Sequence, residues 1–353
     1  MLWGGMKLKI ALLGPVITKS YYGGVATFDE GLAEAFLELG HEVILFTVQK
    51  DIPLNKIIPI ERKSKYSLAS SVNDYHPDIV IASLQYGLYF TRIQNSKKIL
   101  FIHGFFNFES YGVLKTLISV MVTKFMARYS DLLVANSNFT AMINRRIWNI
   151  PVDCIAYLGA DNQFLSHVDK VKSIKKKKGQ ILFAGRLAVS KKVEKIIHAV
   201  SLLNNQDIIY ELVVAGDGPE YRNLKNYAAK CGANTKFLGK VSHENIFDLY
   251  SESEVFISLG ESEPFGITFV EALLSGCKIV CPNTGGQVEF LSSYPDKVCF
   301  VDPLNPQDIA VGIQRLLEEN TEEIDVDNLV ERFNYKNTAK KIISFCEKNL
   351  NNR

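Results

Sequence analysis

Short apolar runs recur along the chain and alternate with segments whose apolar positions have helical spacing. The runs are continuous and do not alternate with polar residues, which is typical of parallel strands covered on both faces of a sheet. In the first half of the chain the pattern predicts strands at 9–13, 43–47, 79–83, 98–102, 132–135 and 154–158.

The segments between these runs predict helices. The first helical segment, 24–39, places five apolar residues on one face: Val25, Phe28, Leu32, Phe36 and Leu39. Strands that alternate with helices form βαβ units and a doubly wound parallel sheet. The pattern therefore predicts a Rossmann-like α/β domain in this half of the chain.

The same pattern begins again after a charged stretch at 173–179 that contains four consecutive lysines. It predicts strands at 181–184, 211–215, 236–238, 255–258, 278–281 and 298–301, and helices at 192–203, 220–231, 244–250, 266–275 and 308–318. We expect two Rossmann-like domains facing a cleft, with an N-terminal acceptor-side domain at 1–170, a linker at 171–179 and a C-terminal donor-binding domain at 180–334. The remaining segment, 335–353, is predicted to be a helix that packs back on the N-terminal domain.

Composition agrees with two soluble cores. The chain has 353 residues, of which 47% are hydrophobic, and single cores rarely grow beyond roughly 250–300 residues. The net charge of +2 gives no indication of nucleic-acid binding. The six cysteines contain no C-x-x-C pair, so we expect neither a disulfide framework nor a zinc site. Without a signal peptide or a long apolar run, we expect a cytoplasmic protein, with membrane contact at the inner face limited to weak peripheral contact.

The main chemical signal follows the predicted strand at 255–258. A polar loop that contains Glu263 leads into a helix that begins near Gly266 and carries Glu271. Amides at a helix start are unsatisfied donors beside the positive end of the helix dipole, which suits phosphate oxygens. The two carboxylates can accept hydrogen bonds from sugar and ribose hydroxyls. The donor-binding candidates of this segment are Phe265, Gly266, Ile267, Thr268 and Glu271, and Glu263 is a catalytic candidate.

A second signal follows the predicted strand at 181–184. Gly185 allows a close approach of the main chain, and the cations Arg186 and Lys191 come next. The planar fork of an arginine and the point charge of a lysine suit a diphosphate that leaves with negative charge. The alternative is a pair of solvated cations at a helix start.

Weaker signals lie at other predicted strand ends. Gly23 and Gly24 open the first helix and let main-chain amides approach a phosphate or a sugar. Asp217, in a Gly-Asp-Gly-Pro turn, caps the next helix or contacts a ligand, and we favour the cap. For Asn136-Ser137 we also favour a helix cap. His103 ends the predicted strand at 98–102, where a structural role and a catalytic role both stay open.

These segments together resemble the retaining glycosyltransferases of family 4. The stretch EPFGITFVEALLSG is similar to the family motif of two glutamates separated by seven residues, here Glu263 and Glu271. The family's G-R-L…K segment matches Gly185, Arg186 and Lys191, except that Lys192 stands where the family usually has glycine. This departure leaves open which of the two lysines faces the site.

The looser segments match the same family. The family's glycine loop falls on Gly23 and Gly24, its turn near the nucleotide base on Asp217, and its histidine near the transferred sugar on His103. A further match, Thr284-Gly285-Gly286, implies packing near the donor phosphate. The segment at 158–161 is similar to the family's crossing between domains, with Leu158 in place of asparagine.

The resemblance implies a GT-B fold and transfer of a hexose from a UDP- or GDP-sugar to a glycan, lipid or small-molecule acceptor. It also implies retention at the anomeric carbon, no cofactor and no obligatory metal. Arg186, Lys191 and the helix amides would stabilise the leaving diphosphate. Two alternatives stay open, a non-catalytic sugar-nucleotide-binding protein and a nicotinamide-dependent oxidoreductase. The second would require a G-x-G-x-x-G turn, which neither half contains.

Two further segments have competing interpretations. Asp325-Val326-Asp327 is a D-x-D sequence, the metal motif of the other glycosyltransferase fold, but it lies between helices and is interpreted as a helix start. The stretch 113–128 is apolar enough for a membrane-surface helix. Lys115 and Lys124 fall on opposite sides of this helix, so the sequence favours a core helix with snorkelling lysines.

Overall fold

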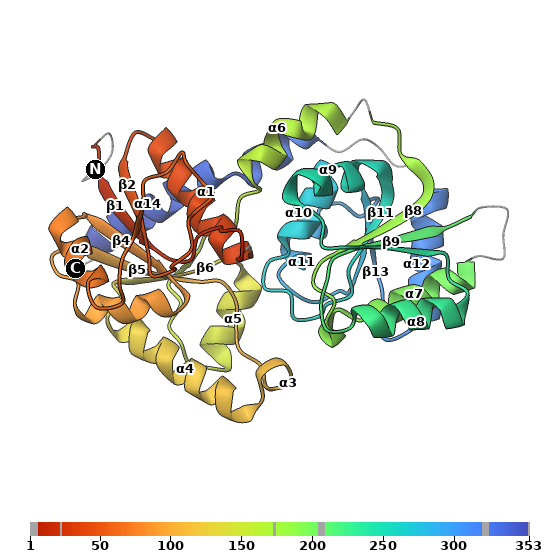
Figure 1. Ribbon diagram of the computed structural model, residues 1–353, viewed down its shortest axis with the longest axis horizontal. Coiled ribbons are helices and arrows are strands. Elements are labelled where there is room, and N and C mark those ends of the chain that lie inside the picture. The colour runs from red at the N-terminus through yellow and green to blue at the C-terminus, as the bar shows by residue number, and fades with distance from the viewer. Residues whose placement is uncertain (1–5, 22, 172–173, 204–208, 320–324, 352–353) are drawn as a thin grey trace. The chain divides into compact units, whose positions relative to one another are not determined.

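The computed structural model describes residues 6–21, 23–171, 174–203, 209–319 and 325–351 (Figure 1). The chain divides into two compact units. The first unit contains residues 1–161 and 331–353, and the second contains residues 162–330. Each unit is built on a parallel sheet with helices on its faces. The predicted α/β class with two Rossmann-like sheets is therefore confirmed.

The described part of the first unit has a seven-stranded sheet in the order β3-β2-β1-β4-β5-β6-β7. Its strands are β1 Lys9–Leu13, β2 Glu42–Thr47, β3 Ile60–Arg62, β4 Ile79–Ser83, β5 Lys97–Ile102, β6 Leu132–Ala135 and β7 Cys154–Ile155. Its helices are α1 Gly24–Glu38, α2 Leu68–Tyr75, the 3-10 helix η1 Leu84–Thr91, α3 Phe108–Tyr111, α4 Val113–Arg128, α5 Asn138–Arg146 and α14 Tyr335–Asn351.

Both faces of this sheet are buried. Along β1, Ile10 and Leu12 pack on the face that α1 and α14 cover, whereas Ala11 and Leu13 pack in the core on the other face. Successive side chains of a strand point to opposite faces, so a continuous apolar run fills both cores. This explains why the strands of the first unit appear in the sequence as continuous apolar runs.

Helix α14 brings the C-terminal segment into the first unit. The ring of Tyr335 lies 5.9 Å from the ring of Phe28 on α1, measured between centroids. A Cβ on Gly31 of α1 would be only 2.4 Å from the Tyr335 ring, so a larger residue at position 31 would displace α14. The polar edge of the contact is a salt bridge of 2.8 Å between Lys336 and Glu38.

The described part of the second unit has a six-stranded sheet in the order β10-β9-β8-β11-β12-β13. Its strands are β8 Lys177–Ala184, β9 Glu211–Ala215, β10 Thr235–Gly239, β11 Ser253–Ile257, β12 Lys278–Cys281 and β13 Val298–Phe300. The helices are α6 Asn162–Val171, η2 Val189–Lys191, α7 Val193–Leu203, α8 Tyr221–Cys231, α9 His243–Glu252, α10 Ile267–Leu274, α11 Val288–Leu291 and α12 Pro306–Glu318, followed by α13 Val326–Arg332.

Each sheet has a point where the strand order reverses. In the first unit this point lies between β1 and β4, and in the second between β8 and β11. Ligands of open α/β sheets bind outside the carboxyl ends of the strands at such a point. The loops that follow these four strands are therefore the places to examine for a site.

The lysine-rich stretch differs from the predicted linker. Lys177, Lys178 and Gly179 lie in β8, because the strand extends to pair with β11 at Ser253. Lys176 is also tied down, since its ammonium group donates to the main-chain oxygen of Ser275 over 2.6 Å. The division between the units falls after residue 161, before α6. The prediction of a linker at 171–179 is therefore wrong for the part of it that forms β8.

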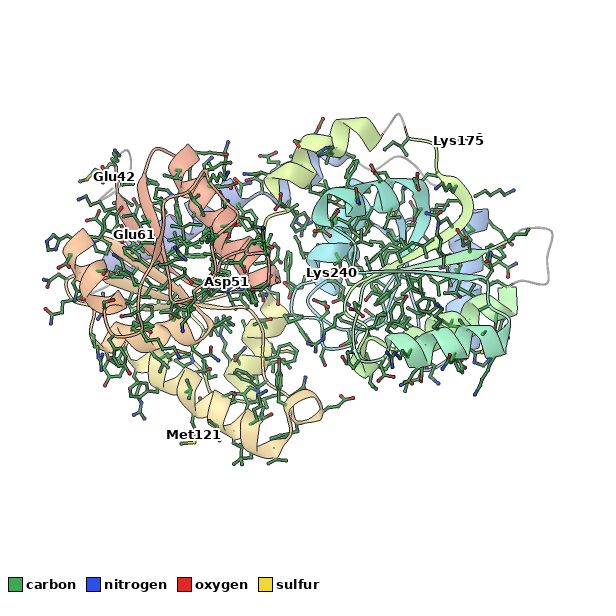
Figure 2. All side chains as sticks on the ribbon, viewed as in Figure 1. Glu42, Asp51, Glu61, Met121, Lys175 and Lys240 are labelled. Carbon is green, nitrogen blue, oxygen red and sulfur yellow. The ribbon has the colours of Figure 1, made fainter. Side chains whose placement is uncertain are left out.

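The core-helix interpretation of 113–128 is also wrong. This segment forms α4, but only one side of it is buried, through Thr116, Val120, Thr123 and Met126. Several large apolar side chains on the other side are exposed, including Leu114 at 73% and Met121 at 69%. Figure 2 shows Met121 on the side of α4 that faces away from the sheet of its unit. Apolar side chains therefore lie on the exposed side of α4 as well as on its buried side, and packing within the unit covers only the buried side.

Candidate functional site

Two glycine loops interlock at the carboxyl ends of β8 and β9. The amide of Gly185 donates to the main-chain oxygen of Ala215 over 2.9 Å. The amide of Leu187 donates to the main-chain oxygen of Asp217 over 3.0 Å. A Cβ on Gly216 would lie 1.8 Å from the main-chain oxygen of Gly185, so this position requires glycine. The two loops thus form one braced main-chain surface at the strand ends.

Arg186 stands on this braced loop. Its side chain is exposed, and within the part of the chain that the structure describes, its guanidinium group has no hydrogen-bond or ion-pair partner. A guanidinium group offers five N–H donors in a planar fork. Arg186 can therefore bind an oxyanion without first releasing a partner on the protein.

Lys191 and Glu263 meet across the reversal point of the sheet. The ammonium nitrogen of Lys191 lies 2.7 Å from Oε2 of Glu263, and their side chains are 29% and 21% exposed. The lysine side chain passes over Gly260, where a Cβ would lie 3.3 Å from its Cδ. The loops after β8 and β11, 72 residues apart in sequence, thus bring together two of the predicted catalytic residues.

The neighbouring lysine has a different partner. Lys192 adopts a left-handed backbone conformation with φ of 51°, and its ammonium group pairs with Glu261. Glycine is the residue that adopts this conformation most easily, which explains physically why a glycine fits the position. The structure thus places Lys191, and not Lys192, beside Glu263.

The loop after β11 turns into α10 at a glycine. Gly266 has φ of 88°, and a Cβ there would lie 2.6 Å from the Phe269 ring, so glycine is required on both counts. The first amides of α10, those of Ile267 and Thr268, stand at the helix N-terminus where intrahelical partners are lacking. Phe265 differs from the prediction in its side chain, which is buried against Phe290 and leaves only main-chain atoms for ligand contact.

The loop after β12 holds the Glu263 loop in place. The amide of Gly286 donates to the main-chain oxygen of Glu263 over 2.8 Å. A Cβ on Gly286 would lie 2.1 Å from the main-chain oxygen of Pro264, so the two loops touch directly. The Thr284–Gly286 segment therefore positions Glu263 through packing, in line with the structural role expected for it.

Glu271 lies on α10 and is held by a buried tyrosine. The hydroxyl of Tyr250 donates to Oε2 of Glu271 over 3.1 Å. Burial, together with the nearby carboxylate, raises the pKa of Tyr250 well above its usual value, so the phenol keeps its proton and stays a donor. The Glu271 carboxylate is thereby oriented on one rigid helix.

Asp217 does not cap a helix. The N-cap of α8 is Glu220, and the Asp217 carboxylate instead accepts a hydrogen bond of 2.7 Å from the amide of Gly218. The favoured cap interpretation is therefore wrong, and the exposed carboxylate at the end of β9 stays a donor-binding prediction. In contrast, the Ser137 hydroxyl accepts from the amide of Thr140 at the start of α5, so the predicted cap there is confirmed.

A buried polar network occupies the strand ends of the first unit. The Ser83 hydroxyl, at the end of β4, donates to Oδ1 of Asp29 over 2.6 Å and lies 2.8 Å from Nε2 of His103. When the Ser83 hydroxyl proton is donated to Asp29, the Ser83 oxygen accepts from the His103 tautomer that carries its proton on Nε2. Asp29 is packed so closely against Gly14, the residue after β1, that a Cβ there would lie 1.9 Å from Oδ2.

Burial shifts the ionisation of this network. It lowers the pKa of His103 to about 3, because the ring lies against Phe28 and Phe101, so the imidazole is neutral near pH 7. Burial also raises the pKa of Asp29 well above its usual range. Sequence reasoning missed Asp29 and Ser83. The available signal was an acidic residue next to Phe28, on the buried side of α1.

The remaining first-unit candidates stand at the start of α1. Gly23 is its N-cap in extended conformation, and Gly24 is exposed, with nothing within 4 Å of where a Cβ would be. Tyr22, in the same predicted loop, lies outside the described residues. No packing against described residues demands glycine at Gly24, so its contact with a phosphate or sugar stays a prediction.

The D-x-D sequence has a structural role. The carboxylate of Asp325 accepts from the amide of Asn328 over 3.1 Å at the start of α13, which confirms the helix-start interpretation. Among the described residues, no group of three or more His, Cys, Asp or Glu side chains is arranged to hold a metal ion. Metal independence of the reaction stays a prediction.

A family model and a relative of similar length both match this chain. Residues 167–342 match the model of the family described as glycosyl transferases group 1. The uncharacterized glycosyltransferase MJ1607 of Methanocaldococcus jannaschii is 26% identical over 392 aligned positions, which cover 96% of this chain and 97% of that protein.

Two solved structures share the whole fold. HepE of Anabaena, solved in complex with UDP, has a TM-score of 0.76 at 17% identity and covers 97% of this chain and 100% of its own. Sucrose-phosphate synthase of Thermosynechococcus elongatus has a TM-score of 0.75 at 17% identity, covering 98% of this chain and 100% of its own. At such identities the likeness concerns the fold.

Proposed function

Since the chain is a glycosyltransferase of group 1 with the GT-B fold, we propose that it transfers a hexose from a UDP- or GDP-sugar to a glycan, lipid or small-molecule acceptor. The transfer retains the configuration at the anomeric carbon and requires no metal. The observation that supports this proposal most directly is the contact of Lys191 with Glu263 at the reversal point of the sheet. The same unit contains the N-terminus of α10 and Arg186, which has no partner among the described residues.

The donor diphosphate is the ligand that these groups fit. Arg186 supplies a planar fork, Lys191 a point charge, and the first amides of α10 supply hydrogen-bond donors at a positive dipole end. Because the loops are braced by main-chain hydrogen bonds before ligand binds, the charges need little rearrangement when negative charge develops. Lys191 would exchange part of its contact with Glu263 for phosphate oxygen.

The two glutamates bind hydroxyl groups. Glu263, whose loop is held by Gly286 and whose side chain pairs with Lys191, would accept a hydrogen bond from a hydroxyl of the transferred sugar. Glu271, which accepts a hydrogen bond from Tyr250, would accept another from a ribose hydroxyl. Asp217 stands at the end of β9 as the candidate for contacts near the nucleotide base. The roles of Gly23, Gly24 and His103 toward the donor stay predictions from the family resemblance.

Retention follows if attack and departure occur on one face of the sugar. The bond from the anomeric carbon to the diphosphate oxygen breaks, and a bond to the acceptor oxygen forms on the same face. The proton of the acceptor hydroxyl passes to the departing phosphate oxygen. In this proposal Arg186 and Lys191 would stabilise the negative charge that the diphosphate carries away.

The test is turnover of a panel of UDP- and GDP-sugars. Donors are first ranked by thermal shift, because a ligand at about 100 times its dissociation constant stabilises by roughly 2.7 kcal/mol. The best donor is then incubated with glycan and lipid acceptors, and the product's anomeric configuration is determined by NMR. We expect retained configuration and equal rates with and without EDTA. Binding without turnover would favour the non-catalytic alternative, an inverted product would contradict retention, and loss of activity restored by manganese would contradict metal independence.

A further inference from the structure

Helix α4 presents an apolar surface that its own unit leaves uncovered. Five large apolar side chains along one side of this helix are exposed: Leu114 (73%), Leu117 (44%), Ile118 (52%), Met121 (69%) and Phe125 (42%). Their spacing of three and four residues places them on one stripe, opposite the buried Thr116, Val120, Thr123 and Met126. A contiguous exposed stripe of this kind marks an interaction surface more often than scattered exposed residues do.

Basic residues border the stripe. At about 100° per residue, Lys115 and Lys124 fall on opposite edges of it, one on each side of the line through Leu114, Ile118, Met121 and Phe125. Arg128 extends the basic edge in the last turn. Residues 113–130 contain three basic residues and no Asp or Glu. Lys115 and Lys124 do not form a separate basic face on α4. Instead, one of them lies on each side of the apolar stripe.

Aromatic residues mark both ends of the stripe. At the N-terminal end, the rings of Phe108 and Trp148 meet edge to face at 5.5 Å, and the indole nitrogen of Trp148 donates to the main-chain oxygen of Phe106. At the other end, the rings of Phe125 and Tyr129 lie 5.1 Å apart. Tyrosine and tryptophan rings favour the boundary between apolar lipid and polar headgroups.

We propose that α4 docks flat on the surface of an anionic phospholipid bilayer. The apolar stripe enters the boundary between headgroups and acyl chains, while Lys115, Lys124 and Arg128 extend to lipid phosphates. Within the described residues no helix is long and apolar enough to cross a membrane. The contact is therefore one of a helix lying in the interface.

The charge around the stripe favours a membrane over a second copy of the chain as its binding partner. A symmetric dimer through α4 would set the same patch of each copy against the other. Lys115, Lys124 and Arg128 would then lie against the basic stripe of the other copy, with no acidic residue at 113–130 to compensate. Glu109 on the short helix α3 is the one acidic residue at 108–130. An anionic bilayer complements the whole stripe.

The test is flotation of the full chain with vesicles of phosphatidylcholine mixed with phosphatidylglycerol, compared with vesicles of phosphatidylcholine alone. We expect binding to the anionic vesicles that weakens as salt is raised. The double substitution Leu117→Ser with Met121→Ser should lower the partition coefficient about tenfold or more, because two apolar side chains no longer enter lipid. Lys115→Gln and Lys124→Gln should each lower it about fivefold at low salt.

Matched controls come from the second unit. Val311→Ser on α12 removes an apolar side chain that is 55% exposed, and Lys225→Gln with Lys230→Gln removes two exposed lysines from α8. These variants should bind like the unmodified chain, and circular dichroism checks that all variants fold. Equal binding of the Leu117 and Met121 double variant, or equal binding to neutral vesicles, would overturn the proposal. So would concentration-dependent dimerisation that Met121→Ser abolishes and that occurs without vesicle binding, since a second copy would then cover the face.

Discussion

The strand ends of the two units carry polar groups that are bonded in different ways. In the first unit, Asp29, Ser83 and His103 bind one another in a buried chain of hydrogen bonds. In the second unit, Arg186 has no partner among the described residues, and the ion pair of Lys191 with Glu263 keeps part of its surface exposed. The first set joins α1 to the carboxyl ends of β4 and β5, and the second set follows β8 and β11, which flank the reversal point of their sheet.

This difference indicates that the first-unit groups hold a side chain in position, whereas the second-unit groups are available to a ligand. Buried polar groups are costly unless they are hydrogen-bonded, so the first-unit network holds His103 in one orientation and one protonation state. Partly exposed ions exchange partners at little cost, because water already screens them. The second unit is therefore the place where a charged ligand can bind and leave, and the first is where a neutral imidazole is kept fixed.

The largest expected effect concerns Lys191. Lys191→Ala should lower kcat about 100-fold, as for removal of one preorganised group that stabilises developing charge. The matched control is Lys192→Ala, which should change kcat little because that ammonium group pairs with Glu261. Steady-state kinetics with the donor identified in the panel measure both. Equal losses in the two variants would mean that the cations act only as a general positive field, and that the contact of Lys191 with Glu263 has no special role.

The next effect concerns the stability of the first unit. The folded-state pKa of His103, about 3, lies below its ordinary value of 6.5. The contribution of His103 to stability is therefore fully present above pH 6.5 and is lost as the pH falls toward 3. Between pH 7 and pH 5 the loss should be about 2 kcal/mol. The variant His103→Asn should lack this component, so its stability should fall by that much less over the same interval.

Urea unfolding at the two pH values measures this difference. Asp29, whose pKa is raised by burial, contributes with the opposite sign, but it is present in both proteins and cancels in the comparison. His76→Asn removes an exposed histidine from the same unit at a left-handed position that asparagine tolerates. This control shows how far the loss of a histidine elsewhere in the unit alters the pH dependence by itself. If His103→Asn keeps the pH dependence of the unmodified chain, His103 is not held neutral by the fold.

The smallest effect should be the coupling between Lys191 and Glu263 in stability. With side chains 29% and 21% exposed, the pair should contribute about 0.2–1 kcal/mol. A double-mutant cycle with Lys191→Met and Glu263→Gln, followed by urea unfolding, isolates this value. A coupling well above about 2 kcal/mol would place the pair among structural groups and remove the contrast between the two units.

Local pattern was enough to predict most of the framework. The strands β4, β6, β9 and β12 lie where the apolar runs predict them, because a strand buried on both faces needs a continuous apolar run. The strand β3, Ile60–Arg62, was missed since two of its three residues are charged. The lysines at the start of β8 were wrongly predicted to form a linker. They extend the strand because its main-chain pairing with β11 outweighs the preference of lysine for solvent.

The candidate site was predicted in its residues but not in its contacts. The sequence placed Arg186, Lys191 and Glu263 at strand ends, and parallel strands bring such ends to one edge of a sheet. It left open which lysine meets Glu263. That choice depends on the left-handed turn at Lys192 and on the space over Gly260, and neither is a property of residue type alone.

By itself, the sequence determined the two doubly wound sheets and the glycines that let loops approach one another, because these depend on periodicity and on steric limits of single residues. Tertiary structure alone decided that Asp29 bonds Ser83 across 54 positions, and that one apolar side of α4 stays uncovered. Periodicity shows that a helix has an apolar face but not what covers it. That depends on which elements the fold brings alongside, and α4 is covered on one side only.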